Sequence, residues 1–126
     1  MIRKIISYKE NFINFYKKQD FKTQEKIEYV FDLVRYEKQV PKKFFKYLES
    51  TDRIYEIRII TAFRSIRILC FFDEGQLVVL TNCFLKKTQK TPKKEIKLAE
   101  KLRIEYLIKK YGGTTKWKTS QILKTY

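Results

Sequence analysis

Residues 54–84, IYEIRIITAFRSIRILCFFDEGQLVVLTNCF, decide the fold of this chain. Three runs within them, Ile54–Thr61, Ile66–Phe72 and Leu77–Phe84, are rich in β-branched, aromatic and leucine side chains, a composition that favours strands. The tripeptide Asp73-Glu74-Gly75 between the last two runs suits a three-residue hairpin loop with glycine in the left-handed position. The stretch therefore predicts a three-stranded antiparallel meander.

The segments before this meander favour a short strand and two helices. Residues 2–6 form an apolar segment that suits an edge strand, and Asn11–Lys18 suits a short helix. A second helix is expected over Lys22–Lys38, where apolar residues recur at helical spacing. We expect Pro41 to end it, because proline disfavours helix at the preceding residue. A short apolar turn is expected over residues 44–48.

The segment after the meander favours one further helix. We expect it to start at Thr91-Pro92, because threonine is an acceptable N-cap and proline suits the first helical position. Gly112-Gly113 should end it, and its buried stripe should consist of Ile96, Ala99, Leu102 and Tyr106. The element order is then β-α-α-β-β-β-α, which predicts an α+β fold: an antiparallel sheet with two N-terminal helices and one C-terminal helix.

The composition excludes several kinds of chemistry. The 126 residues include no histidine, so the chain has no His-based triad and no histidine metal ligand. Cys70 and Cys83 are too few for a four-ligand zinc site within one chain. No apolar run approaches the ~20 residues that span a bilayer, and charges interrupt the N-terminal segment, unlike a signal peptide. We therefore expect a cytoplasmic protein with reduced thiols, no cofactor, no metal and no membrane partner.

The net charge of +15 indicates a polyanionic partner, and nucleic acid is favoured over an anionic membrane. Residues 81–126 hold 13 basic and 3 acidic side chains, against 16 and 11 in residues 1–80, so the polyanion site should lie mainly in the last third. The length predicts one domain, residues 1–110. A basic tail follows over residues 111–126, where Trp117 either packs against the domain or stacks on a base.

A phosphate site is expected on one face of the meander. Arg58 and Arg67 lie on consecutive strands, and Lys86 follows the third strand. Alternation along the first strand places Glu56 and Arg58 on the same face. Guanidinium groups bind phosphate through two hydrogen bonds and lysine binds it as a point charge, so this group suits a phosphate.

A solvated sheet face would carry similar charges, and the pattern alone favours that interpretation. Arg58 could pair with Glu56 or with a cross-strand neighbour, and the lysines of residues 86–94 could form a solvated run. Arg67 fits this interpretation poorly, because it lies inside an apolar strand, where a charge usually faces solvent or a ligand. Clustered cations would also lower the pKa of nearby lysines.

Several motifs resemble the RelE/HigB-like toxins of type II toxin–antitoxin systems, and most closely a phage-derived HigB-type subfamily. They are YEIR at residues 55–58, RSIRIL at 64–69, and FLKKTQKTP at 84–92 with EIKLA at 95–99. The resemblance covers about residues 1–108, and the RelE-like fold that it implies agrees with the element order above. It implies an mRNA interferase that cuts messenger RNA, commonly on the ribosome, and that a cognate helix-turn-helix antitoxin neutralises.

The chemistry that this resemblance implies is attack by a ribose 2′-hydroxyl on the adjacent phosphate, without a metal or cofactor. By motif position, Arg58 and Arg67 would stabilise the transition state, and Lys86 would bind phosphate or protonate the leaving group. Glu56, at a position where some relatives have a basic residue, is the candidate base or an orienter of Arg58. The histidine or C-terminal tyrosine that some relatives have near the site has no counterpart here. Further RNA-binding residues would be Arg64, Lys87, Lys90, Lys93 and Lys94.

Two other functions stay open at the level of the sequence. The related ParE-like branch has the same fold and inhibits DNA gyrase by binding, without catalysis. A plain RNA- or DNA-binding module would also explain the charge. The arginine-rich strand face and the KKTQKTP segment favour the ribonuclease, whereas the missing histidine leaves room for the gyrase inhibitor.

Overall fold

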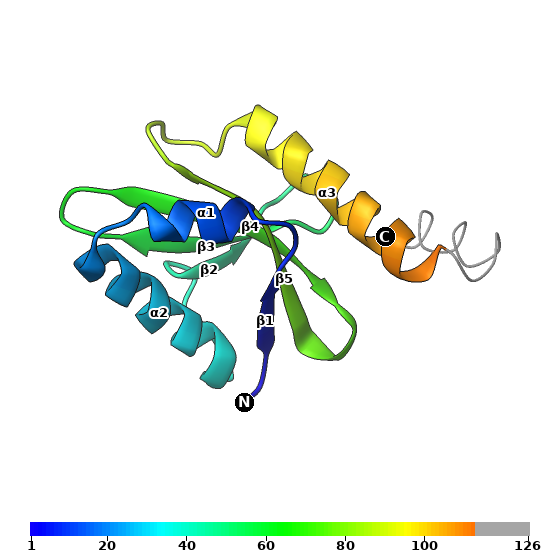
Figure 1. Ribbon diagram of the computed structural model, residues 1–126, viewed down its shortest axis with the longest axis horizontal. Helices are drawn as coiled ribbons and strands as arrows, with labels where there is room; N and C mark the ends of the chain where they lie inside the picture. Colours follow the sequence, from blue (N-terminus) through cyan, green and yellow to red (C-terminus); the bar gives the residue numbers. More distant parts are fainter. Residues whose placement is uncertain (113–126) are drawn as a thin grey trace.

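The structure is a computed structural model that describes residues 1–112 as a five-stranded sheet packed against three helices (Figure 1). The elements, in chain order, are β1 (Lys4–Ser7), α1 (Asn11–Lys17), α2 (Phe21–Tyr36), β2 (Phe45–Tyr47), β3 (Tyr55–Ile60), β4 (Ser65–Asp73), the short 3-10 turn η1 (Glu74–Gln76), β5 (Leu77–Leu85) and α3 (Lys93–Tyr111). Tyr111 of the expected tail belongs to α3 and Gly112 is the C-cap of that helix, whereas residues 113–126, including Trp117, lie outside the described residues. The boundary between domain and tail therefore stays a prediction.

The strands follow the order β1-β5-β4-β3-β2 across the sheet. The meander of β3, β4 and β5 and the α+β class are confirmed, and β1 is an edge strand as expected. Two details of the expectation are wrong. The sheet is mixed, because β1 runs parallel to β5, and residues 45–47 form strand β2 instead of a turn. The β2 pairing depends on aromatic contacts with the distant Tyr55, whose ring stacks on Phe45 at 5.4 Å between centroids.

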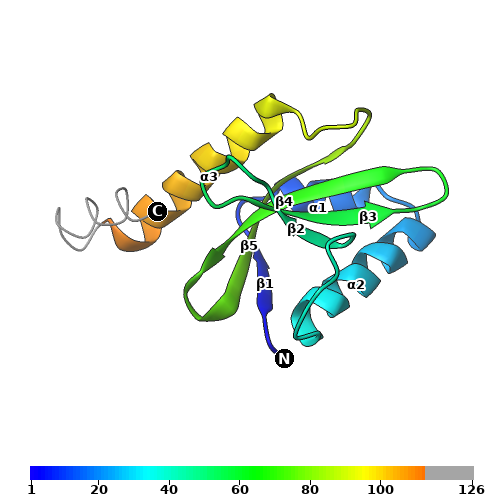
Figure 2. The same ribbon diagram turned by 180° about the vertical axis from the view of Figure 1, so that it is seen from behind.

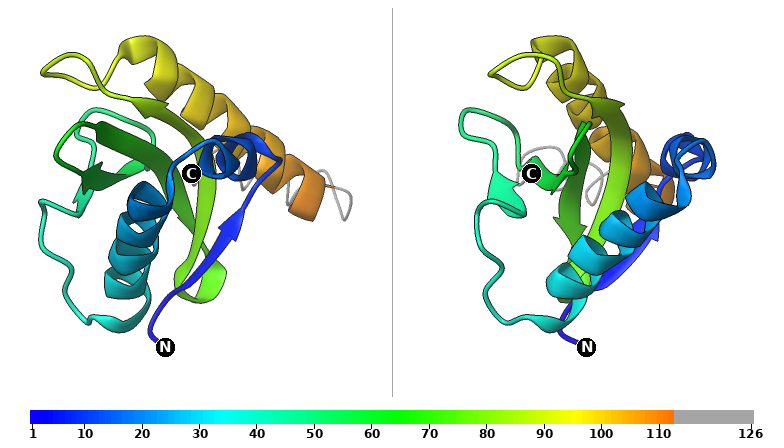
Figure 3. Two further views of the ribbon diagram at one scale, coloured as in Figure 1. Left: turned by 60° about the vertical axis from the view of Figure 1, so that its left-hand side comes forward. Right: turned by 90° about the vertical axis from the view of Figure 1, so that its left-hand side faces the viewer.

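Each face of the sheet has its own apolar core, because successive strand residues point to opposite faces. One core packs Ile57 and Ile59 of β3 against α2, whose buried residues are Thr23, Ile27, Val30, Phe31 and Val34. The other packs Leu69 and Phe71 of β4 against Ala99 of α3. Figures 2 and 3 show the result, with α2 and α3 on opposite sides of the strands. Within residues 1–112, every helix is too short or too polar to span a lipid bilayer.

The helix termini and the hairpin turn correct the sequence analysis in detail. Helix α2 begins after Asp20, whose carboxylate accepts a hydrogen bond from the Thr23 backbone N–H at 2.8 Å, and it ends at Tyr36 rather than at residue 38. Pro92 is itself the N-cap of α3, without a side-chain cap, so the Thr91 cap was a wrong prediction. Gly75 takes the expected left-handed conformation, with φ of +68°, but the hairpin loop is Glu74–Gln76, one residue later than expected, because Asp73 still pairs with Leu77.

A buried carboxylate fastens the C-terminal end of α3 to the β4–β5 hairpin. Asp73 accepts hydrogen bonds from Tyr106 Oη at 2.7 Å, Lys110 Nζ at 2.6 Å and Tyr111 Oη at 2.9 Å. Burial raises the pKa of Asp73, but these hydrogen bonds and one from the Glu74 backbone N–H outweigh it and hold the pKa below its ordinary value. The sequence pattern indicates only a turn position for Asp73.

Asp73→Asn should destabilise the fold by about 1–3 kcal/mol, because an amide cannot replace the charged acceptor of these three partly buried hydrogen bonds. The free energy of unfolding in urea near neutral pH measures the loss. Glu74→Gln is the matched control, since the Glu74 side chain is exposed and the stability should not change.

The difference in stability between Asp73→Asn and the unmodified protein should disappear at low pH. The folded-state pKa of Asp73 is lowered, so its contribution is complete above the unfolded value of about 4 and disappears as the pH falls through the folded value. The stabilities of Asp73→Asn and the unmodified protein should therefore converge in strong acid. A constant difference from neutral pH to strong acid would show that the carboxylate charge is not what fastens α3.

Candidate functional site

Cations from three neighbouring strands gather on the face of the sheet that also packs against α3. Arg58 of β3 and Arg67 of β4 are directly opposite each other in the antiparallel register. Lys86 follows β5 directly, and its backbone N–H donates to the Ser65 carbonyl at 2.7 Å, which continues the ladder alongside β4. Like charges that face each other across strands repel. The arrangement therefore needs negative charge beside it.

Glu56 supplies that charge from within the sheet. Its carboxylate forms an ion pair with Nε of Arg67, and both residues are only 3% exposed. The Nη1 group of Arg67 donates to Ser65 Oγ at 3.0 Å and to the Ile66 carbonyl at 3.2 Å. Burial lowers the pKa of Arg67, Glu56 opposes this shift and Arg58 adds to it. Glu56 therefore contacts Arg67 and not Arg58, the neighbour expected from the sequence.

Arg58 differs from Arg67 because it forms no ion pair with a carboxylate among residues 1–112. Its Nε is buried and forms no hydrogen bond with any residue in the described part of the chain. An unsatisfied buried donor costs about 1–3 kcal/mol. Such groups are explained when a ligand supplies the missing acceptor. Arg58 is therefore positioned to bind an anion.

Lys86 has a lowered pKa because of where it lies. Burial is the largest cause, and the charges of Arg67, Arg58 and Lys46 act in the same direction while Glu56 opposes them. This ammonium group releases its proton more readily than an exposed lysine does. The chain has no histidine, so Lys86 is the group of this cluster best suited to donate a proton.

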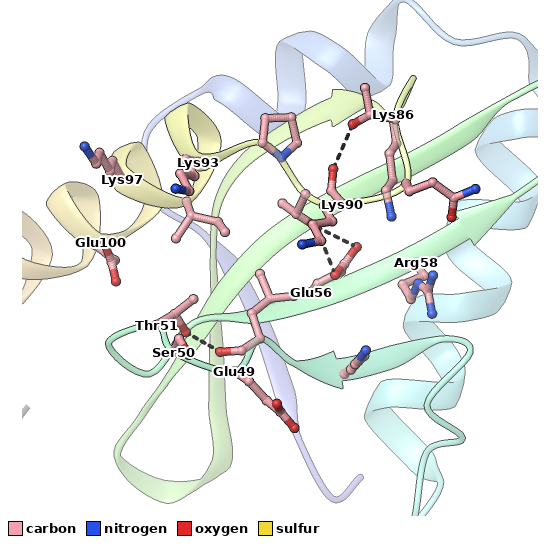
Figure 4. A pocket seen from close by; sticks show the side chains of 17 residues that line it. Glu49, Ser50, Thr51, Glu56, Arg58, Lys86, Lys90, Lys93, Lys97 and Glu100 are labelled. Atoms are coloured by element: carbon pink, nitrogen blue, oxygen red, sulfur yellow. Dashed lines mark hydrogen bonds between the residues drawn. The ribbon is translucent and has the colours of Figure 1, made fainter.

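Two adjoining clefts of about 900 and 530 Å³ meet at this cluster and share Arg58 and Lys86. The smaller cleft continues over Ser65, Arg67 and Lys87. The larger continues between β2, β3 and the start of α3, as Figure 4 shows, and it includes the side chains of Lys46, Lys90, Lys93 and Lys97. An extended polyanion could thus follow a basic surface through both clefts.

The β2–β3 loop that forms one wall of the larger cleft is fastened to α3. The Asp52 backbone N–H donates to Glu100 Oε2 at 2.8 Å, and the Asp52 carboxylate pairs with the buried Arg103 at 3.1 Å. Two non-glycine residues of this loop, Ser50 and Arg53, have φ of +64° and +65°. A conformation of this kind costs on the order of 1–3 kcal/mol and persists only where the surroundings enforce it. The wall is therefore preformed.

The structure gathers most of the residues expected from the sequence, with two exceptions. Glu56, Arg58, Arg67 and Lys86 lie together, and the clefts also include Lys87, Lys90 and Lys93. Arg64 lies away from them: its guanidinium is 3.6 Å from the Asp20 carboxylate and donates to Thr23 Oγ1 at 3.4 Å, at the start of α2. Lys94 is exposed and lines neither cleft.

Three residues of the larger cleft were missed in the sequence analysis. Lys46 is the register partner of Glu56, but β2 was expected to be a turn, so its pairing was invisible. Lys97 follows Lys93 at the i+4 spacing, which places both on one side of a helix and could have identified it. Thr91 was assigned as a cap, whereas its hydroxyl lies 3.4 Å from both carboxylate oxygens of Glu56.

The two cysteines do not take part in this cluster. Cys70 is buried in the core that packs against α2, and Cys83 is half-buried. Burial raises the pKa of both thiols, that of Cys83 to about 12, so both stay neutral and unreactive. This agrees with their interpretation as small apolar residues.

The fold has a counterpart among solved structures. One chain of the crystal structure of the archaeal RelE–RelB complex from Pyrococcus horikoshii OT3 is similar with a TM-score of 0.51 and 17% sequence identity, over 72% of this chain and 100% of that chain. This likeness establishes a RelE-like fold. Residues 14–103 match the family model described as Phage derived protein Gp49-like (DUF891). The chain therefore belongs to the phage-derived Gp49-like family, a RelE-type toxin family.

The resemblance expected from the sequence motifs is thereby confirmed at the level of the toxin family. The comparison with curated proteins found no match. The finer assignment to a HigB-type subfamily stays a prediction.

Glu56→Gln should destabilise the fold by about 3–5 kcal/mol, because it leaves the buried Arg67 without its counter-charge. Replacing both partners, as Glu56→Leu with Arg67→Met, should recover most of this loss, since apolar pairs of similar volume often substitute for buried ion pairs. Urea denaturation measures each free energy of unfolding. Glu49→Gln, an exposed carboxylate at the same cleft, is the control and should stay neutral. A double variant as unstable as Glu56→Gln would contradict this account of the pair.

Proposed function

We propose that this protein is the toxin of a type II toxin–antitoxin pair and that it cleaves messenger RNA. The observation that carries the proposal is the buried, unpartnered Nε of Arg58 beside Arg67 and Lys86. Fixed cationic donors of this kind stabilise the charge that develops on a phosphate under attack. Membership of a RelE-type toxin family supports the same function.

In the proposed reaction the ribose 2′-hydroxyl oxygen forms a bond to phosphorus, and the bond from phosphorus to the 5′ oxygen breaks. Arg58 and Arg67 bind the non-bridging oxygens, and Lys86 protonates the departing 5′ oxygen. The products are a 2′,3′-cyclic phosphate and a 5′-hydroxyl end. DNA lacks the attacking hydroxyl, so the reaction is confined to RNA.

Glu56 acts in this proposal as a positioning residue. Its carboxylate accepts from Arg67, and the Thr91 hydroxyl lies 3.4 Å from both of its oxygens. Because its carboxylate is occupied by these contacts, Glu56 is better suited to position Arg67 than to remove a proton from the 2′-hydroxyl. We therefore assign that proton to water or to a group of the ribosome, which would orient the RNA and complete the site.

The proposed partners are the ribosome with its messenger RNA and a helix-turn-helix antitoxin. The net charge of +15 favours association with ribosomal RNA. The similar solved structure is titled a RelE–RelB complex, and this supports an antitoxin partner here.

Arg58→Gln and Lys86→Gln should each lower the rate of message cleavage by roughly 100-fold or more, as the loss of one transition-state donor does elsewhere. Both side chains lie at the clefts and not in the apolar cores, so the variants should stay folded. Primer extension on messages from an expressing bacterium locates and quantifies the cuts. Lys94→Gln removes a charge outside both clefts and should leave cleavage unchanged.

Other outcomes of the same experiment would contradict the ribonuclease. Growth arrest with intact messages and accumulating DNA breaks would identify a gyrase inhibitor of the ParE type. Binding to ribosomes without cleavage or growth arrest would identify a plain RNA-binding module.

The pH dependence of the cleavage rate should reflect the protonation state of Lys86. The protonated form is the acid, and its pKa is below the ordinary value, so the rate should fall at alkaline pH as Lys86 loses its proton. Single-turnover cleavage across the pH range, with Lys86→Gln compared, measures this limb. An alkaline decrease that persists in Lys86→Gln would remove Lys86 from the role of acid.

A further inference from the structure

The turn between β3 and β4 presents an aromatic side chain to solvent. Phe63 is 94% exposed, the highest value among the large apolar residues of the described chain. A side chain that stays in water contributes little to the stability of the fold. Sites for single-stranded nucleic acid place exposed aromatic rings next to a basic groove, and the exposure of Phe63 leaves its ring free to contact a base in this way.

The backbone of this turn is held in one conformation. The Thr61 backbone N–H donates to the Arg64 carbonyl at 2.9 Å, and Thr61 Oγ1 accepts from the backbone N–H groups of Phe63 at 3.3 Å and Arg64 at 3.0 Å. The Arg64 side chain then contacts Asp20, the N-cap of α2, and Thr23 in its first turn. Arg64, which the sequence analysis assigned to RNA, thus fastens the turn that carries Phe63. A preformed platform of this kind reduces the entropy lost on binding.

The turn continues directly from the strands that carry the cationic cluster. From the facing pair Arg58 and Arg67, the register proceeds to Ile60 opposite Ser65, and then to the turn. Ile60 is 55% exposed on the same face as Arg58, roughly 7 Å along the strand, and Ser65 lines the smaller cleft. Figures 1 and 2 show the tip of this hairpin at the same end of the molecule as the segment between β5 and α3.

We propose that Phe63 stacks on an unpaired base of the RNA whose phosphate binds at Arg58 and Arg67. This inference rests on the proposed function and adds a recognition element to it. Sites for single-stranded nucleic acid combine a basic groove for the backbone with aromatic side chains on which bases stack. The smaller cleft supplies the groove, through Arg67, Lys86 and Lys87, and Phe63 supplies the aromatic side chain beyond it.

The test is binding of a fluorescein-labelled single-stranded RNA whose 2′-hydroxyls are methylated, which prevents cleavage, measured by fluorescence anisotropy. Phe63→Ala should weaken binding roughly 5- to 100-fold, the range for loss of one stacked base. Phe63→Trp should bind at least as tightly as the unmodified protein, and Phe63→Leu, apolar but without a ring, should resemble Phe63→Ala.

Tyr36→Ala is the matched control, because Tyr36 is also an exposed aromatic, 59% accessible, but ends α2. The 16 residues of this helix place it roughly 24 Å from the helix start that Arg64 contacts. The control variant should bind the RNA normally. Changes of equal size in Tyr36→Ala and Phe63→Ala would overturn the proposal.

The remaining outcomes separate this inference from the function on which it rests. RNA binding that Phe63→Ala leaves unchanged would overturn the stacking role alone. Binding of the RNA by Phe63→Leu as tight as that of the unmodified protein would indicate simple apolar contact and would also overturn the stacking role. No binding of the RNA by the unmodified protein would overturn the stacking role, while cut messages in the primer-extension experiment would still support the proposed ribonuclease.

Discussion

The buried ion pair between Glu56 of β3 and Arg67 of β4 is the interaction on which the rest of the site depends. Arg58 and Arg67 face each other across two strands, and without a carboxylate beside Arg67 their repulsion would oppose the pairing of those strands. One carboxylate cannot neutralise three cations, however. Arg58 keeps a buried donor without a protein partner, and Lys86 adds a further positive charge. The pair thus stabilises the sheet and leaves an excess of positive charge that an anionic ligand can balance.

The segments that form the walls of the larger cleft are held in place by contacts that lie away from the cation cluster. Asp73 fastens the C-terminal end of α3, and the contacts of Asp52 with Glu100 and Arg103 fasten the loop that faces the start of the same helix. Because α3 is bonded both to the β4–β5 hairpin and to the β2–β3 loop, the larger cleft exists before any ligand binds. Donors that are already in place need no reorganisation when charge develops on a bound phosphate, which is where enzymes gain most of their electrostatic effect.

The sequence predicted those features that depend on local patterns. The meander, α2, the glycine turn and the common face of Glu56 and Arg58 all follow from periodicity and turn chemistry. The features that it missed depend on contacts between distant residues. Strand β2 needs Tyr55, and the position of Arg64 needs the start of α2. From the sequence Glu56 was expected beside Arg58, because the two lie on one face of the same strand. Its actual partner, Arg67, is on the next strand, and only the register between the strands brings the two together.

Because the chain has no histidine, the cation cluster also controls the protonation of Lys86, the candidate acid. Burial, Arg67, Arg58 and Lys46 lower the pKa of Lys86, so the groups that would bind a phosphate also determine how firmly this lysine holds its proton. A bound phosphate would offset part of their positive charge and raise the pKa of Lys86 again. In the proposed reaction Lys86 would then be protonated while the message is bound, and it would release its proton as negative charge moves to the departing 5′ oxygen. Substrate binding would thereby set the protonation state that the last step requires, a task that other ribonucleases give to histidine.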